Sequence, residues 1–334
     1  MLFPFLGFPS WFEERTVYNK YIESAPSLFK PTSLAECDIA VLPYAYLSEE
    51  HVSYRHQQLF IDDAANKGKL VIANVSGDTY QAVSDPNVIA LRHELYQSRK
   101  TKYEYQIPQW TQDLKTHNDG RDWEAVTKTV KPKISFCGYA TPLGLDTFSS
   151  LKPLLRHWLE QVPYVNKYIK PRFSYQVNAL KLLLSDKSVD CDFIIRRTFA
   201  FGKYGEIDLK LTNPNRIQFI ENMYNSPYAL CARGGANCSL RLYEALSCGR
   251  IPVIVDSDCV LPFNDLINWS DYAIIVPYQK LQLIGSILNS FHASISSNDF
   301  VNRQALCRNL WDEWVSPNGF YSKFNFVLRN LLCL

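Results

Sequence analysis

The sequence lacks the patterns that are typical of secreted and metal-binding proteins. Its nine cysteines are scattered and odd in number, and none is spaced as Cys-x-x-Cys. This argues against a zinc site and a disulfide framework, and it favours reduced, mostly buried thiols. The apolar start at 1–9 is short, interrupted by proline and without a basic leader, so it predicts neither a signal peptide nor a spanning helix. These absences favour a cytoplasmic chain.

Strong charge and sequence repeats are also missing. The formal net charge is +2 and there is no basic run, so the chain has no electrostatic signature of a nucleic-acid-binding protein. No internal repeat or low-complexity segment is visible. The composition, with 47% hydrophobic and 20% charged residues, is that of a folded globular protein. A length of 334 residues is enough for two α/β domains.

The most informative stretch begins with a strand, a glycine turn and a helix. Residues Tyr228–Ala232 form a short apolar run that ends before the pair Gly234-Gly235, as expected of a buried strand that leads into a turn. Asn237 and Ser239 are residue types that cap helices, and good helix formers follow at 240–247.

The same stretch continues with a helix end and a second strand. Gly249 can end the helix, because glycine tolerates the left-handed conformation found at helix ends. Ile251–Val255 is a second apolar, β-branched run. Two buried parallel strands joined by a helix form a βαβ unit, and the ligand of such a unit lies beyond the carboxyl ends of its strands.

The turn before the helix offers groups that bind anions. It combines backbone N–H groups and a helix N-terminus with the guanidinium groups of Arg233 and Arg241, which suit a phosphate or diphosphate. Glu244 lies three residues after Arg241 and therefore on the same face of the helix. Its carboxylate can accept hydrogen bonds from the hydroxyls of a ribose or sugar. The alternative is an ordinary crossover helix with one intrahelical Arg-Glu pair.

The order and spacing of these pieces resemble the donor-binding signature of the exostosin family. The resemblance rests on Arg-Gly, a short polar turn, Ser-Leu-Arg-Leu-Tyr-Glu-Ala-Leu, Cys-Gly-Arg-Ile-Pro-Val-Ile-Val and Leu-Pro-Phe within 228–263. Exostosins are inverting glycosyltransferases. The resemblance implies an α/β protein of the GT-B fold, with two Rossmann-like domains facing a cleft. It also implies a UDP- or GDP-sugar donor and a hydroxyl of a glycan or glycoconjugate as acceptor.

Animal and plant exostosins are typically anchored in Golgi membranes, and this chain departs from them. We therefore expect a bacterial exostosin-like enzyme that is cytoplasmic or peripheral to the inner membrane. Two alternatives stay open. One is a fucosyltransferase-like GT-B enzyme, and the other is a catalytically silent GT-B subunit that binds glycan or supports a partner enzyme.

Apolar runs that alternate with helical patterns predict two α/β domains, at 1–131 and 132–315. The resemblance implies that the first is the acceptor-side domain, that the second binds the nucleotide-sugar, and that a C-terminal helix at 316–334 packs back on the first domain. The expected strands are Asp38–Pro43, Lys69–Asn74, Val88–Leu91, Lys133–Gly138, Asp192–Arg197 and Tyr272–Val276, besides the two above. The expected helices are Tyr54–Lys67, Thr147–Gln161, a helix to Tyr224 capped by Asn213-Pro214, Lys280–His292, Asn302–Trp314 and Tyr321–Leu332.

The donor site draws on two further strand ends. One strand ends at Gly138, as phosphate-side turns require, and another ends in Arg196 and Arg197. The expected donor-binding residues are Gly138, Arg196, Arg233, Gly234, Asn237, Ser239, Arg241 and Glu244.

We expect neither a cofactor nor a metal ion. Asp190-Cys191-Asp192 and Asp256-Ser257-Asp258 both spell the Asp-x-Asp pattern that binds metal in GT-A enzymes, but the second follows a strand of the βαβ unit and the implied fold is not GT-A. No carboxylate cluster at metal spacing supports an ion. Arginine side chains and the helix N-terminus would then neutralise the leaving group.

An inverting transfer needs a general base near the acceptor hydroxyl. Asp78 is our first candidate, because it follows a strand in the turn Val-Ser-Gly-Asp-Thr, which resembles the Ser-Gly-Asp turn of bacterial exostosin-like chains. Glu49 is the second candidate, with Glu50 and His51 beside it after the preceding strand. A solvated loop carboxylate is the alternative for each.

Overall fold

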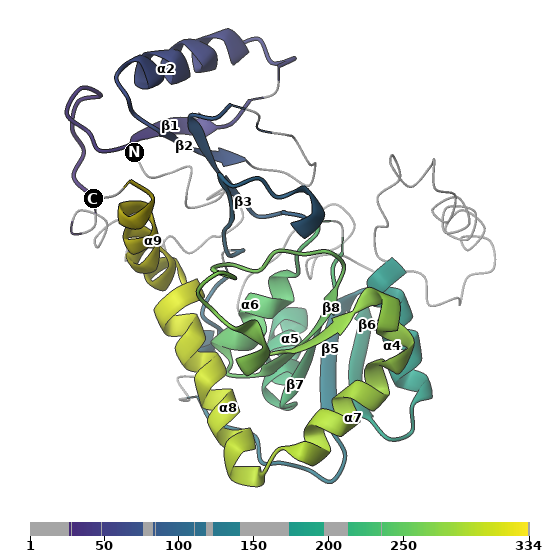
Figure 1. Ribbon diagram of the computed structural model, residues 1–334. Helices are drawn as coiled ribbons and strands as arrows, with labels where there is room; N and C mark the ends of the chain where they lie inside the picture. Colours follow the sequence, from purple (N-terminus) through teal and green to yellow (C-terminus); the bar gives the residue numbers. More distant parts are fainter. Residues whose placement is uncertain are drawn as a thin grey trace. The chain divides into compact units, whose positions relative to one another are not determined.

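The computed structural model describes residues 27–75, 83–117, 123–140, 174–196 and 213–332, except positions 28, 48, 84, 110 and 235 (Figure 1). The chain divides into two compact units. Unit 1 comprises 1–112, 258–267 and 311–334, and unit 2 comprises 113–257 and 268–310. Each unit is built on a parallel sheet, which confirms the expected α/β class with two sheets.

The sheet of unit 1 has four described strands in the order β1-β2-β3-β4, all parallel. These strands are β1 (Ala40–Ala45), β2 (Val71–Val75), β3 (Val88–Arg92) and β4 (Glu104–Gln106). Helix α2 (Tyr54–Asn66) connects β1 to β2. β4 was not expected, because its three residues are Glu-Tyr-Gln and show no apolar run. It is held in the sheet by a buried ion pair, in which Arg92 Nε lies 2.6 Å from Glu104 Oε1.

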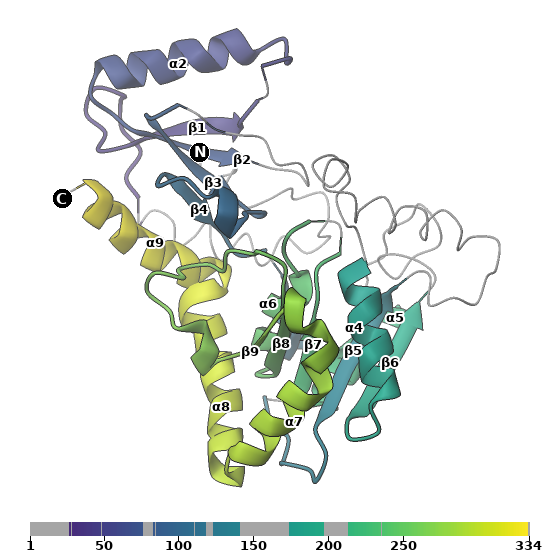
Figure 2. The ribbon, with the colours of Figure 1, turned by 45° about the vertical axis from the view of Figure 1, so that its right-hand side comes forward.

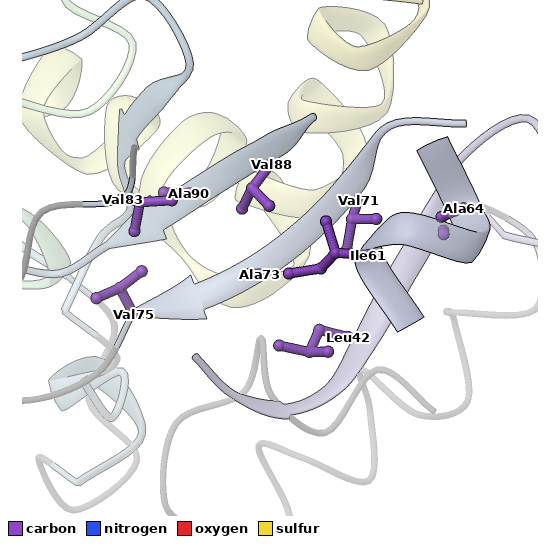
Figure 3. Close-up of a cluster of buried hydrophobic side chains, with 10 residues drawn as sticks. Leu42, Ile61, Ala64, Val71, Ala73, Val75, Val83, Val88 and Ala90 are labelled. Atoms are coloured by element: carbon purple, nitrogen blue, oxygen red, sulfur yellow. The ribbon is translucent and has the colours of Figure 1, made fainter. Parts of the chain in front are cut away.

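Both faces of this sheet are covered. Successive strand residues point to opposite faces, and β2 divides in this way. Val71, Ala73 and Val75 contribute to one core together with Ile61 of α2 (Figure 3). Ile72 belongs to a separate core, to which the C-terminal helix α9 (Pro317–Leu332) contributes four side chains: Phe320, Tyr321, Phe324 and Leu328.

The sheet of unit 2 has five described strands in the order β6-β5-β7-β8-β9, all parallel. The strands are β5 (Lys133–Tyr139), β6 (Asp190–Arg196), β7 (Tyr228–Cys231), β8 (Ile251–Asp256) and β9 (Ile274–Pro277). The helices are α4 (Ser174–Ser185), α5 (Pro214–Tyr224), α6 (Leu240–Ser247), α7 (Ile284–Ser294) and α8 (Ser297–Leu310).

This strand order positions the site. The chain runs from β5 to β6 in one direction across the sheet and then returns past β5 to β7. Because such crossovers are right-handed, α4 lies on one face of the sheet while α5 and α6 lie on the other (Figure 2). In sheets of this order, ligands bind at the carboxyl ends of the two strands on either side of the reversal. In unit 2 those strands are β5 and β7.

Residues 113–131, which we assigned to the first domain and its linker, lie with unit 2. Asp113 accepts two hydrogen bonds from the guanidinium group of Arg308, at 2.6 and 2.8 Å. Further along, the Val126 N–H donates a hydrogen bond to Gln304 Oε1, and the Val126 carbonyl accepts one from Gln304 Nε2. These contacts tie the segment to α8, which explains why the unit begins at Asp113.

Residues 258–267, which we assigned to the second domain, lie with unit 1. Phe263 has a positive φ of 53°, and its ring lies 5.4 Å from Trp314 and 5.3 Å from Phe320. Phe263, the last residue of the family signature, therefore belongs to unit 1 because it packs on aromatic residues of the C-terminal segment.

Several element boundaries differ from those expected. The helix expected to begin at Lys280 starts as a 3₁₀ helix, η6 (Tyr278–Leu283), before α7. The helix expected from Asn302 begins at Ser297 and passes at Trp311–Val315 into a π-helical turn, η7. α4 was not expected, and the expected helix Thr147–Gln161 lies outside the described residues. No helix in the described part of the chain combines the length and the apolar character needed to cross a bilayer.

Candidate functional site

The turn between β7 and α6 is organised by a buried asparagine. Asn237 is fully buried, and its Oδ1 accepts hydrogen bonds from Arg233 Nη1 and from Ser257 Oγ, both at 2.8 Å. Ser239 occupies the N-cap position of α6, but its side chain makes no capping hydrogen bond to a described residue. Of the two residue types that cap helices, Ser239 thus stands at the N-cap position, and Asn237 lies two residues before it. The side chain of Asn237 fixes the shape of the turn through Arg233 and Ser257.

Arg233 belongs to the same network. It is buried, and its guanidinium carbon lies 5.6 Å from the centre of the Tyr175 ring, at the start of α4. Gly234 follows in a half-buried bend. Arg233 therefore brings positive charge to the carboxyl end of β7, in an orientation set by Asn237 and Tyr175.

Arg241, in the first turn of α6, lies at the carboxyl end of β5. Its Nη2 donates a hydrogen bond to the carbonyl oxygen of Cys137 at 2.7 Å. Its guanidinium carbon lies 4.3 Å from the centre of the Phe136 ring and 5.4 Å from that of Phe219. Nη1 is buried and has no hydrogen-bond partner among the described residues. The guanidinium group is thus held in place, and its Nη1 still has hydrogen-bond donors that no described residue uses.

Gly138 is needed for this arrangement. A Cβ atom added at Gly138 would lie 2.7 Å from Arg241 Nη2, so a side chain there would displace the guanidinium group from its position. From the sequence, we expected Gly138 to allow the close approach of a phosphate. In the structure, the guanidinium group of Arg241 lies against this glycine.

Glu244 is paired across two helices. It is 8% exposed, and its Oε1 lies 3.7 Å from Nη1 of Arg216, a buried residue of α5. Burial raises the pKa of Glu244, and the positive charges of Arg216 and Arg241 oppose that increase. The ion pair of Glu244 thus joins α5 to α6, whereas the alternative considered from the sequence was a pair within α6.

Sequence reasoning missed Arg216. Asn213 caps α5 through a hydrogen bond from the Asn215 N–H at 2.9 Å, with Pro214 next, as expected. Arg216 therefore lies in the first turn of the helix, where the helix dipole disfavours a cation. That unfavourable position was the available signal that Arg216 pairs with a carboxylate elsewhere.

Arg196 is engaged by α5. Its Nη2 donates to the carbonyl oxygen of Asn215 at 2.8 Å and to Gln218 Oε1 at 2.9 Å. It ends β6, beside β5, so it lies at the expected end of the sheet, where it fixes the start of α5. Arg197 lies outside the described residues.

One carboxylate in each of the two Asp-x-Asp patterns has structural partners. Asp258 accepts a hydrogen bond from the Ser98 N–H at 3.1 Å and has a φ of 68°. Asp192 accepts a hydrogen bond from Ser226 Oγ at 3.4 Å, and it lies 3.5 Å from Lys133 Nζ. Within the described ranges, no group of three or more histidine, cysteine, aspartate or glutamate side chains is placed to hold a metal ion.

The base candidates are placed only in part. Asp78 lies outside the described residues. Glu49 and Glu50 lie exposed in the turn that follows β1, and His51 there accepts a hydrogen bond at Nδ1 from the Ser53 N–H.

Part of this chain is similar to known proteins of one family. Residues 194–291 match the family model described as the Exostosin GT47 domain. A probable glucuronosyltransferase of Oryza sativa subsp. japonica is 38% identical over 121 residues, which are 34% of this chain and 27% of that protein. A probable β-1,4-xylosyltransferase of Arabidopsis thaliana is 40% identical over 121 residues, which are 34% of this chain and 28% of that protein. The chain thus spans about a quarter of the length of these relatives.

Among solved structures, TarM has a TM-score of 0.35 at 11% identity, with 79% of this chain and 50% of that chain covered. A glycosyltransferase from Rickettsia africae has a TM-score of 0.35 at 8% identity, with 86% of this chain and 84% of that chain covered.

The segment matched by the family model begins in β6 and ends in α7. It therefore contains Arg196, the turn that carries Arg233 and Asn237, and the α6 residues Arg241 and Glu244. The similarity to the Exostosin GT47 domain thus covers the part of unit 2 that carries these side chains.

Proposed function

We propose that this chain is a glycosyltransferase that moves a sugar from a UDP- or GDP-sugar to a hydroxyl of a glycan or glycoconjugate, with inversion and without a metal ion. The observation that carries the proposal is the position of Arg241. Its guanidinium group is fixed over Gly138 by the Cys137 carbonyl, at the carboxyl end of β5 and beside the start of α6. A cation and a helix N-terminus together suit the diphosphate of a nucleotide-sugar.

The proposed roles follow from the charges of these groups. Negative charge develops on the diphosphate as the bond to the sugar breaks, and fixed donors that meet this charge stabilise the transition state. Arg241 and the first N–H groups of α6 would supply those donors, with Arg233 adding positive charge nearby. Glu244 would accept hydrogen bonds from ribose hydroxyls. Asp78, or Glu49, would take the proton of the acceptor hydroxyl.

Calorimetry of UDP and GDP in the presence of EDTA tests the donor site. We expect one of the two to bind, and Arg241→Ala to weaken that binding about tenfold or more, because a charge-assisted hydrogen bond to the diphosphate is lost. Lys187→Ala is the matched control. Lys187 is an exposed cation in the turn before β6, at the amino end of the sheet, and its loss should leave the affinity unchanged.

Three results would change the proposal. Binding that disappears in EDTA and returns with Mn²⁺ would contradict metal independence. Failure of the parent protein to bind either nucleotide would remove the donor site from this position. Nucleotide binding without release of nucleotide from any of a panel of UDP- and GDP-sugars, with glycan acceptors present, would favour the silent subunit.

A further inference from the structure

Arg216 is a buried charge that the proposed reaction does not yet use. It is 4% exposed, its Nη1 lies 3.7 Å from Glu244 Oε1, and its guanidinium carbon lies 5.3 Å from the centre of the Phe219 ring. The same ring lies 5.4 Å from the guanidinium carbon of Arg241. Both cations thus lie close to the Phe219 ring. Arg216 forms the ion pair with Glu244, and Arg241 donates to the Cys137 carbonyl.

We propose that Arg216 is a positioning residue, which holds the carboxylate of Glu244 in its charged form and in the orientation that accepts hydrogen bonds from the ribose hydroxyls of the donor. This inference rests on the proposed function, since it assumes that Glu244 contacts the donor. Arg216 itself would not touch the substrate.

The surroundings of Glu244 explain why it needs a cation. A buried carboxylate tends to take up a proton, because burial penalises the charged form. Among the described residues, four titratable groups interact with Glu244: Arg216 from α5, Arg241 from α6 itself, Cys231 from β7 and Cys248 at the end of α6. Burial raises the pKa of both thiols, so they are neutral at physiological pH. The charge of Glu244 therefore depends on the two arginines.

A purely structural role would not require these charges. A buried ion pair contributes little net stability, and apolar residues of similar volume often replace one without loss. A neutral glutamic acid would carry a proton on one oxygen, so it would lose much of its capacity to accept hydrogen bonds. The pair therefore suits a carboxylate that must stay charged next to a ligand.

The test measures how much the ribose hydroxyls contribute to nucleotide affinity. The probes are UDP and 2′,3′-dideoxy-UDP, or the GDP equivalents if the parent protein prefers GDP, and their affinities are compared between pH 5.5 and 9. At pH 7.5 we expect the parent to prefer the normal nucleotide about tenfold, which is the range of a hydrogen bond to a charged group. This preference should fall as the pH is lowered and Glu244 takes up a proton.

Three variants separate positioning from packing. Arg216→Gln should reduce the preference close to one at pH 7.5 and restore part of it toward pH 9, where Glu244 loses its proton without help. Arg216→Lys keeps the cation and should keep most of the preference. Glu244→Gln should give a low preference that does not change with pH. Glutamine is used there because it keeps the length of the side chain and an oxygen that can accept a hydrogen bond from Arg216, which alanine would not.

Arg308→Gln is the matched control, because it breaks another partly buried ion pair of unit 2, the one with Asp113 at 2.6 Å. It should leave the hydroxyl preference and its pH dependence unchanged. If Arg216→Gln keeps the parent preference and pH profile, or loses affinity equally for both probes as a destabilised protein would, the inference is wrong. If the parent binds neither nucleotide, the proposed function fails and the inference fails with it.

Discussion

At the scale of single residues, Gly138 and Arg241 form one functional pair. A methyl group at Gly138 would meet the far end of the flexible Arg241 side chain at 2.7 Å, so the guanidinium group can move aside without a change in the backbone. We predict that Gly138→Ala leaves the thermal stability nearly unchanged but weakens nucleotide binding about as much as Arg241→Ala does, roughly tenfold or more.

The double variant Gly138→Ala/Arg241→Ala decides whether the glycine acts through the arginine. If it does, the two effects are not additive, and the double variant binds nucleotide like Arg241→Ala alone. Additive losses would instead mean that Gly138 contacts the nucleotide directly, as the sequence analysis expected.

A second residue-scale prediction concerns the general base. If Asp78 takes the proton of the acceptor, Asp78→Asn should lower turnover by roughly a hundredfold or more. Nucleotide affinity, measured by calorimetry, should stay close to that of the parent, because the donor residues are unchanged. Full turnover in this variant would exclude Asp78, and Glu49→Gln would then be the next variant, followed by changes at Glu50 and His51.

At the scale of elements, a buried histidine links α7 to the central strand β7. His292 Nε2 lies 2.7 Å from the carbonyl oxygen of Thr129, and its Nδ1 lies 3.0 Å from the hydroxyl of Tyr228. A carbonyl only accepts, so Nε2 carries a proton, and in the neutral ring Nδ1 accepts from the tyrosine. Burial lowers the pKa of His292 below its usual 6.5, which favours this neutral ring.

We therefore predict that acid destabilises unit 2 through His292. Because the folded-state pKa is depressed, the stability contribution is fully present above pH 6.5 and is lost as the pH falls through the folded value. Urea denaturation at pH 7.5 and 5 should show a smaller pH effect in His292→Gln, by at most about 1.4 kcal/mol per pH unit. Equal pH effects in parent and variant would contradict the prediction.

Helices α5 and α6 follow local rules at their ends but not in their pairing. The Asn213-Pro214 start of α5 and the bounds of α6 agree with the sequence analysis, because capping and propensity act over a few neighbouring residues. The ion pair between Arg216 and Glu244 joins the two helices. The position of Arg216 in the first turn of α5 indicates that it pairs with a carboxylate. No local pattern identifies Glu244 as that carboxylate, since the pair arises only when both helices pack on the same face of the sheet.

At the scale of the whole molecule, each unit has a core of its own. The core that α9 shares with the sheet of unit 1 contains Phe324, which is 2% exposed. We predict that Phe324→Ala destabilises unit 1 by about 3–5 kcal/mol, the usual cost of a large cavity. Hydrogen exchange should then quicken in β2 and β3, whereas nucleotide binding in unit 2 should persist below the unfolding temperature.

Phe326 supplies the control for this prediction on the same helix. Its side chain is 59% exposed, so Phe326→Ala should change the free energy of unfolding by no more than about 0.5 kcal/mol. Equal destabilisation by the two substitutions would show that α9 does not pack on the sheet through Phe324.

The alternation of strands and helices, the glycine turn before α6 and the family signature could be predicted from the sequence, because each depends on neighbouring residues and their periodicity. The partners of the side chains could not, and they follow from the packing of the folded chain. Arg241 meets the Cys137 carbonyl across 104 positions of sequence, and Phe263 joins unit 1 through an aromatic cluster. Such contacts depend on the packing of distant segments. The turn residue Asn237 is one case, since burial directed its amide to Arg233 and Ser257 and away from the helix that it precedes.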